Sequence, residues 1–304
     1  MKPWQPEVAL GLDDVRRRLD AEQPDLRGAP LSVLGQGFDS LAVRVGGEGV
    51  PHDIVFRFTR RALAARLMVR EIRWTPWLQP RLPVPISASV RWALPSEAEP
   101  LPYAGHRWLD GTTGCRAALA PAATRRLAED VGRFLAALHA LPLPDDAPPD
   151  VISRSDAVHR GTRALQRLTE RLPADEGAAV RAAIVPRLGV APRRAPPTWV
   201  HGDVYGRHLL VDEPSGALRG VIDWGDVHAG DPAIDLSIAW SLFTGDDRAA
   251  LLAAYGTPVD PDAADRARLV AFDYAGALIL YGEDVGDAPA AALGWRALRC
   301  ALAP

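Results

Sequence analysis

Short segments of alternating apolar and polar residues dominate the first hundred positions. Such segments are typical of strands with one buried face, and the glycines between them favour turns. We therefore expect an antiparallel meander, with an amphipathic helix at 12–21 before it. A charged helix is expected after the meander at 59–74, and Pro76 should end or kink it. Two further strands are expected around 88–94 and 101–108. The meander strands are expected at 31–36, 41–45 and 53–58.

From residue 122 onward the apolar spacing becomes helical. One face of the first helix carries five apolar residues at i, i+4, i+7, i+8 and i+11, namely Leu127, Val131, Phe134, Leu135 and Leu138. His139 ends this helix, and we interpret it as a cap or core contact. Further helix is expected at 155–185 with a break at Pro173, a loop from Pro186 to Pro197, and a new helix after Asp231 and Pro232.

Length and composition limit the classes of protein to consider. With 304 residues and 48% hydrophobic content, the chain can form one or two closely packed domains. It has neither an apolar run of membrane-spanning length nor a leader-like start, so we expect a cytoplasmic protein without a membrane partner. Cys115 and Cys300 have no metal-like spacing and are expected to be free thiols. No basic run is interleaved with aromatic residues, which argues against nucleic acid.

Charge is distributed unevenly along the chain. Residues 1–202 carry 22 acidic and 28 basic side chains, whereas residues 203–304 carry 16 and 7. A basic part and an acidic part suit a site that binds a polyphosphate and a cationic acceptor, although ordinary solvation of surface helices explains the asymmetry equally well.

The most informative segment runs from His201 to Asp235. Asp203 lies between two apolar segments, His208 follows five residues later, and Asp223 follows after twenty. A loop aspartate can orient a hydroxyl nucleophile, a residue five positions on can reach a metal, and an aspartate after a buried strand can hold Mg²⁺ against phosphates. This spacing therefore predicts a phosphoryl-transfer site with Asp203 as the catalytic residue.

The same segment, VHGDVYGRHLL and VIDWGDVHAGDPAIDL, resembles the aminoglycoside and macrolide phosphotransferases, whose motif is HGDxxxxN and IDWxxxxxGDPxxDL. The resemblance implies an α+β, bilobal, protein-kinase-like fold, with an antiparallel nucleotide-binding lobe at 1–105 and a mainly helical catalytic and acceptor-binding lobe at 106–304. It also implies that His201, Asp231 and Asp235 support the site structurally.

His208 departs from the family motif, which usually has Asn at this position. An imidazole is a borderline ligand for Mg²⁺, so His208 could bind the metal through water, favour Mn²⁺, or contact a phosphate. Macrolide phosphotransferases are similar to this chain in having His here.

A second group of residues is expected to bind the nucleotide phosphates. Gly35, Gly37 and Ser40 form a glycine loop between two predicted strands, although an ordinary hairpin is the alternative. In similar proteins a strand lysine usually binds the α- and β-phosphates of the nucleotide. Lys2 is the only lysine of this chain, so Arg57 is expected to take that role. Glu71 is its natural ion-pair partner, with solvated charge as the alternative.

Two further sets of residues follow from the resemblance and from charge. The segment 104–111 is similar to the family's hinge, which places His106 and Trp108 beside the purine, with ATP and GTP both open as donors. Acidic residues late in the chain could bind an ammonium group of the acceptor, and we name Asp226, Glu283 and Asp284.

These observations predict an O-phosphotransferase, monomeric or homodimeric, that acts on a small cationic molecule. An aminoglycoside or macrolide antibiotic is the leading acceptor, which would make the chain an antibiotic-resistance enzyme. Choline-, homoserine- or sugar-type kinases are alternatives, as is a nucleotide-binding pseudoenzyme. A dinuclear metal hydrolase is a further alternative, with ligands His201, Asp203, His208, Asp223 and His228.

Overall fold

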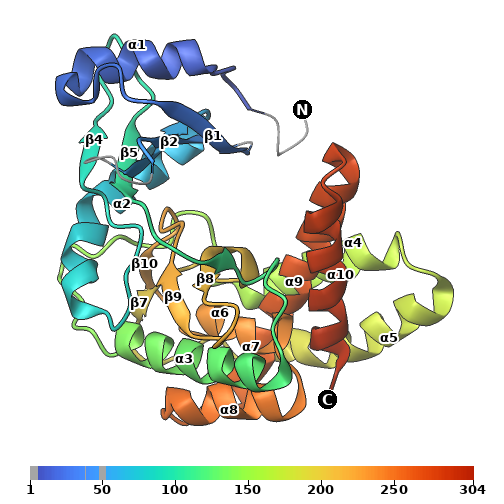
Figure 1. Ribbon diagram of the computed structural model, residues 1–304. Helices are drawn as coiled ribbons and strands as arrows, with labels where there is room; N and C mark the ends of the chain where they lie inside the picture. Colours follow the sequence, from blue (N-terminus) through green and yellow to red (C-terminus); the bar gives the residue numbers. More distant parts are fainter. Residues whose placement is uncertain (1–5, 38, 48–52) are drawn as a thin grey trace. The chain divides into compact units, whose positions relative to one another are not determined.

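The computed structural model describes residues 6–37, 39–47 and 53–304 (Figure 1). The chain divides into two compact units. Unit 1 comprises Met1–Arg81, Pro85–Asp110 and Asp223–Asp226, and unit 2 comprises Leu82–Val84, Gly111–Ile222 and Val227–Pro304. The short segment Asp223–Asp226 thus belongs to unit 1 although its neighbours in sequence belong to unit 2.

The described residues of unit 1 form a five-stranded antiparallel sheet and two α-helices. The strand order is β1-β2-β3-β5-β4, and the first three strands form the meander that the alternating pattern predicts. The strands are β1 (Leu31–Gln36), β2 (Ser40–Val45), β3 (Ile54–Thr59), β4 (Arg91–Ala93) and β5 (Tyr103–Arg107), and the helices are α1 (Leu12–Glu22) and α2 (Ala62–Leu78).

Apolar side chains of α1 and of the sheet form the core of unit 1. Val15 and Leu19 of α1 pack in one cluster with Phe56 and Phe58 of β3 and Tyr103 of β5. All five are at most 1% exposed. The amphipathic face expected for residues 12–21 is therefore the face that covers the sheet.

Helix α2 runs four residues beyond Trp74, through Pro76 to Leu78, so the predicted end at residue 74 was wrong. A proline lacks the N–H that would bond to the carbonyl of Ile72, and this loss is tolerated because the helix has only two more residues. The hydroxyl of Thr75 donates to the carbonyl of Glu71 at 2.7 Å. The helix that carries Glu71 is thus complete around that residue.

Unit 2 is mainly helical and contains two small sheets, β6-β8-β9 and β10-β7. The break predicted at Pro173 is confirmed, and Asp231 accepts the N–H of Ala233 at the helix start that was also predicted. The helices are α3 (Pro121–His139), α4 (Ala157–Thr169), α5 (Ala174–Ile184), α6 (Ala233–Leu236), α7 (Ile238–Ser241), α8 (Gly245–Tyr255), α9 (Pro261–Val285) and α10 (Ala288–Leu302). The strands are β6 (Thr112–Thr113), β7 (Thr198–Val200), β8 (Leu209–Val211), β9 (Leu218–Val221) and β10 (His228–Gly230).

The apolar face predicted for α3 is buried, with all five of its residues at most 1% exposed. On the same helix, a Cβ added at Gly132 would lie 2.3 Å from the carbonyl oxygen of Leu251 in α8. The two helices therefore approach so closely that only glycine fits at the crossing. None of the helices in the described part of the chain is long and apolar enough to cross a membrane.

Candidate active site

The loop that carries Asp203 follows β7, and a buried carboxylate accepts hydrogen bonds from its backbone. Asp235, fully buried, accepts the backbone N–H of His201 at 2.7 Å and of Gly202 at 2.9 Å. Nε2 of His139 lies 3.1 Å from the same carboxylate, and the hydroxyl of Tyr255 bonds to Nδ1 of His139. Burial alone would raise the pKa of Asp235, but His139, His201 and the N–H of Gly202 hold that pKa below its usual value. The loop is thus bound to the ionised carboxylate of Asp235.

His201 fixes the loop through main-chain groups. The N–H of Asp203 donates to Nδ1 of His201 at 3.3 Å, so Nε2 carries the proton and donates to the carbonyl of Ile222 at 3.1 Å. Burial lowers the pKa of His201, which favours this neutral form. His201 therefore links the Asp203 loop to the end of β9.

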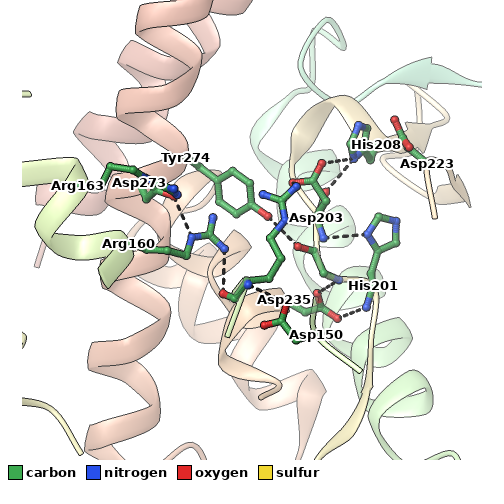
Figure 2. Close-up of polar contacts among 12 residues, drawn as sticks. Asp150, Arg160, Arg163, His201, Asp203, His208, Asp223, Asp235, Asp273 and Tyr274 are labelled. Carbon is green, nitrogen blue, oxygen red and sulfur yellow. Dashed lines mark hydrogen bonds and ion pairs between the residues drawn. The ribbon is translucent and has the colours of Figure 1, made fainter. Parts of the chain in front are cut away.

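Asp203 presents its two carboxylate oxygens to different neighbours (Figure 2). Oδ2 lies 3.8 Å from Nδ1 of His208, and Oδ1 lies 3.7 Å from Nη2 of Arg154. The Asp203 side chain is 19% exposed, which leaves the carboxylate accessible from one side. Such a carboxylate can orient a hydroxyl group and later take its proton.

The turn Gly206–His208 brings His208 back toward Asp203. Nδ1 of His208 donates to the main-chain carbonyl of Asp203 at 2.8 Å. Because Nδ1 is engaged in this way, only Nε2 could serve as a metal ligand. The neutral imidazole of His208 therefore carries its proton on Nδ1.

Asp223 belongs to unit 1, where it meets the residues expected to bind phosphate. Nη2 of Arg57 lies 3.0 Å from Oδ1 of Asp223 and 3.2 Å from Oε2 of Glu71. The backbone of Asp223 has φ +67°, a left-handed conformation that aspartate tolerates better than most residues, and its N–H donates to the hydroxyl of Ser87 at 3.2 Å. Strained backbone of this kind concentrates at functional sites.

Carboxylates outnumber cations around Arg57. Burial, together with the charges of Asp223 and Asp226, raises the pKa of Glu71 to about 7, and the same two acids act with burial to raise that of Asp39. The side chain of Asp223 is 45% exposed. A divalent cation fits this excess of negative charge, since Mg²⁺ uses one or two carboxylates and takes its other ligands from phosphates and water. No three described acids, histidines or cysteines form a metal site by themselves.

The glycine loop joins β1 and β2 as a hairpin. The N–H of Gly37 donates to the carbonyl of Ser40 at 2.9 Å, and a Cβ added at Gly35 would meet no atom within 4 Å. A phosphate needs such open space beside the backbone in order to approach the N–H groups. Phe38, in the middle of this loop, lies outside the described residues.

His106 and Trp108 lie at the end of β5 and just beyond it. His106 is buried, its Nδ1 bonds to the carbonyl of Arg107 at 2.8 Å, and burial lowers its pKa to about 4. The ring of Trp108 lies 3.8 Å from the guanidinium of Arg44, and its Nε1 donates to Asp110 at 2.8 Å. Trp108 thus already stacks against a cation within unit 1.

The residues expected to bind the acceptor are divided between the two units. Asp226 belongs to unit 1, whereas Glu283 and Asp284 are exposed residues of α9 in unit 2. Glu283 forms an ion pair with Arg171 at 2.9 Å. Asp231, expected to support the site, binds Nε of Arg266 at 2.6 Å in the interior of unit 2.

Sequence reasoning missed Arg154, Asp150, Asp273 and Ser87. They lie in segments without a recognisable motif. The fold brings Arg154 to Asp203 and Ser87 to Asp223, whereas Asp150 accepts the backbone N–H of Arg154 and Asp273 binds Arg160. No spacing rule could have found Arg154, which precedes its partner by 49 residues.

Comparison with known proteins agrees with the fold. A family model described as a phosphotransferase enzyme family matches residues 30–272. A viomycin phosphotransferase of Streptomyces vinaceus is 33% identical over 90 residues, which are 29% of this chain and 31% of that protein. The chain therefore matches about a third of that relative's length.

Solved structures resemble nearly the whole chain. The GDP complex of an aminoglycoside 2'-phosphotransferase-IIIa has a TM-score of 0.70 at 22% identity, covering 96% of this chain and 98% of that one. A macrolide 2'-phosphotransferase type I has a TM-score of 0.63 at 22% identity, covering 98% and 99%. At this identity the likeness establishes the fold, and the predicted α+β kinase-like fold is confirmed.

Proposed function

This chain belongs to the phosphotransferase enzyme family, and we propose that it transfers the γ-phosphate of ATP or GTP to a hydroxyl group of an aminoglycoside or macrolide antibiotic. In this reaction the hydroxyl oxygen bonds to the γ-phosphorus, the bond from that phosphorus to the β,γ-bridging oxygen breaks, and the hydroxyl proton passes to Asp203. The nucleoside diphosphate leaves with the bridging oxygen.

The placement of Asp203 is the observation that supports this proposal best. Its loop is fixed by the buried Asp235 and by His201, while its carboxylate remains accessible. In phosphoryl transfer the protein contributes mainly by positioning, so a rigid loop that aims a carboxylate at the acceptor is what the chemistry needs.

Unit 1 supplies the groups proposed for the phosphates. Arg57 is always charged and can bind phosphate oxygens with two nitrogens, and the open backbone at Gly35 and Gly37 can add N–H donors, with Ser40 at the start of the next strand. His106 and Trp108 are proposed to lie beside the purine. Asp223 would hold Mg²⁺, with His208 as a further ligand that also suits Mn²⁺. When bound, the cation neutralises charge on the phosphates.

Other parts of the proposal rest on the family and on charge. Acceptor ammonium groups are proposed to meet Asp226, Glu283 or Asp284, and the enzyme is proposed to act in the cytoplasm as a monomer or homodimer. A small-metabolite kinase stays open as an alternative. The metal-hydrolase alternative gains no support, because the described residues offer no ready group of three metal ligands.

An acceptor screen tests the proposal. ATP and GTP are each offered with aminoglycosides, macrolides and small alcohols, and transfer is followed by release of nucleoside diphosphate and by the mass of the phosphorylated product. We expect transfer to at least one antibiotic with wild-type protein and transfer that is at least about a hundredfold slower with Asp203→Asn. Release of diphosphate without any phosphorylated acceptor would contradict the proposal, and so would transfer confined to metabolite alcohols.

A further inference from the structure

The loop 150–156, which precedes α4, has a conformation fixed from within. The carboxylate of Asp150 accepts three backbone N–H groups, from Ile152 at 3.3 Å, Arg154 at 2.9 Å and Ser155 at 2.6 Å. Between them Ser153 has φ +56°, which is uncommon for a residue other than glycine. The backbone of this loop is therefore held in one defined conformation by hydrogen bonds from within the loop.

Groups outside the loop fix it further. The N–H of Ala229 in β10 donates to the carbonyl of Pro148 at 2.8 Å. Nη1 of Arg160 donates to the carbonyl of Arg154 at 3.3 Å, and Nε of Arg160 binds Asp273 of α9 at 2.9 Å (Figure 2). Arg160 and Asp273 are each 2% exposed. A buried ion pair thus anchors the backbone of Arg154.

The same part of α9 also anchors the Asp203 loop. Tyr274, next to Asp273, donates its hydroxyl to the carbonyl of Gly202 at 3.3 Å, and its ring lies 4.7 Å from the guanidinium of Arg160. Two adjacent residues of one helix therefore hold both the loop of Arg154 and the loop of Asp203. This common support holds the backbones from which the two charged side chains extend.

The contact between these two charges is an ion pair without a direct hydrogen bond. Nη2 of Arg154 lies 3.7 Å from Oδ1 of Asp203, beyond hydrogen-bond range, and the two side chains are 26% and 19% exposed. A hydroxyl oxygen can therefore reach Oδ1 while the guanidinium stays beside it. A group attached next to a hydroxyl bound at Oδ1 would lie close to the positive charge of the Arg154 guanidinium.

We propose that Arg154 is a specificity-determining residue of the acceptor site, which selects hydroxyl groups that have no ammonium on the neighbouring carbon. This inference rests on the proposed function and narrows it, since an aminoglycoside carries several hydroxyls in different charge environments. An ammonium beside the reacting hydroxyl is repelled by the guanidinium, whereas a neutral neighbour is not. A cation elsewhere on the acceptor is unaffected, because charge effects weaken with distance and with salt.

The test uses pairs of acceptors found by the screen. The two members of a pair differ only at the carbon next to the reacting hydroxyl, which carries an ammonium group in one member and a hydroxyl group in the other. We expect wild-type kcat/KM to favour the neutral member, and Arg154→Gln to shift the ratio about tenfold toward the ammonium member, or ~1.4 kcal/mol. Arg154→Lys should retain the preference. Arg219→Gln, which removes an equal charge from an ion pair with Asp212 at the surface, should leave it unchanged.

The outcomes separate this inference from the proposed function. If Arg154→Gln lowers kcat/KM equally for both members, the inference is wrong and the phosphotransferase proposal stands. If the wild-type protein phosphorylates no acceptor, the proposed function fails and the inference fails with it.

A second measurement needs no substrate. Thermal midpoints of the wild-type protein, Arg154→Gln, Asp203→Asn and the double variant form a double-mutant cycle. We expect the two changes to be non-additive, with less coupling at high salt. Additive changes in midpoint would show that the two charges do not interact, and would overturn the inference.

Discussion

The two aspartates of the proposed reaction, Asp203 and Asp223, are held in contrasting ways. Asp203 lies on a loop fixed by the buried Asp235, and its side chain is 19% exposed. Asp223 has φ +67° and a side chain that is 45% exposed, and it binds Arg57 among several other carboxylates. One acid is held rigidly beside a histidine and an arginine, and the other lies where negative charge is in excess.

This difference suits the two roles that we propose for these aspartates. A carboxylate that orients a hydroxyl needs a defined direction, which the hydrogen bonds of the Asp203 loop provide. A carboxylate that binds a divalent cation needs surplus negative charge and access from outside, which the surroundings of Asp223 provide. Environments that differ in this way assign different roles to chemically identical groups.

The largest expected effect comes from Asp203→Asn. The amide keeps the size of the side chain but cannot take the proton of the acceptor hydroxyl, so kcat should fall by roughly 10²–10⁴-fold. Nucleotide affinity should stay within about twofold of wild type, because the residues proposed to bind the nucleotide are unaltered. Steady-state kinetics and calorimetric titration with a nucleotide check this. A variant with wild-type turnover would remove Asp203 from the reaction.

Acid should destabilise the protein through His106 in unit 1. Burial lowers the pKa of His106 to about 4, below the ~6.5 of an unfolded chain, so the unfolded state binds an extra proton between these values. The stability present above pH ~6.5 is therefore lost as pH falls toward ~4, by up to about 3 kcal/mol. Urea unfolding at pH 7 and pH 5 should show a smaller loss for His106→Gln than for wild type. His159→Gln, which alters an exposed histidine of α4, is the control and should lose as much as wild type.

Replacing Asp223 should weaken Mg²⁺-dependent nucleotide binding by roughly 10–100-fold, the range seen when groups that support a metal are removed. Asp223→Asn and Asp223→Ala should share this loss. Alanine should also destabilise the fold by about 1 kcal/mol, since it tolerates the left-handed backbone less well than asparagine. Titrations with and without Mg²⁺, together with thermal unfolding, separate the two effects. Equal affinity with and without the carboxylate would contradict the proposed metal site.

The smallest effect is expected for Arg57→Lys. Nη2 of Arg57 lies near both Glu71 and Asp223. The guanidinium can bind phosphate oxygens with two nitrogens, whereas the ammonium group of lysine has only one nitrogen. We expect nucleotide affinity to fall by about three- to tenfold, measured by the same titration. Arg91→Lys, in β4 at an ion pair with Asp25, provides a matched control in unit 1 that should leave affinity unchanged. Unaltered binding by Arg57→Lys would mean that only the charge matters.

Local patterns in the sequence were good guides to the elements and to part of the site. The meander, the buried face of α3, the break at Pro173 and the helix start at Asp231 all depend on neighbouring residues, and the structure confirms them. The ion pair expected between Arg57 and Glu71 is also present. The end of α2 was misjudged because a proline near the last turn costs little.

By itself, the sequence determined the fold class and pointed to the pair of aspartates proposed for the reaction, because periodic burial and a motif with set intervals are both properties of short stretches of chain. Only the tertiary structure decided what surrounds each aspartate. Arg154 reaches Asp203 through a buried ion pair between α4 and α9, and Ser87 reaches the backbone of Asp223 across 136 residues. Contacts between segments so distant along the chain depend on how helices and strands pack, and no local pattern encodes that packing.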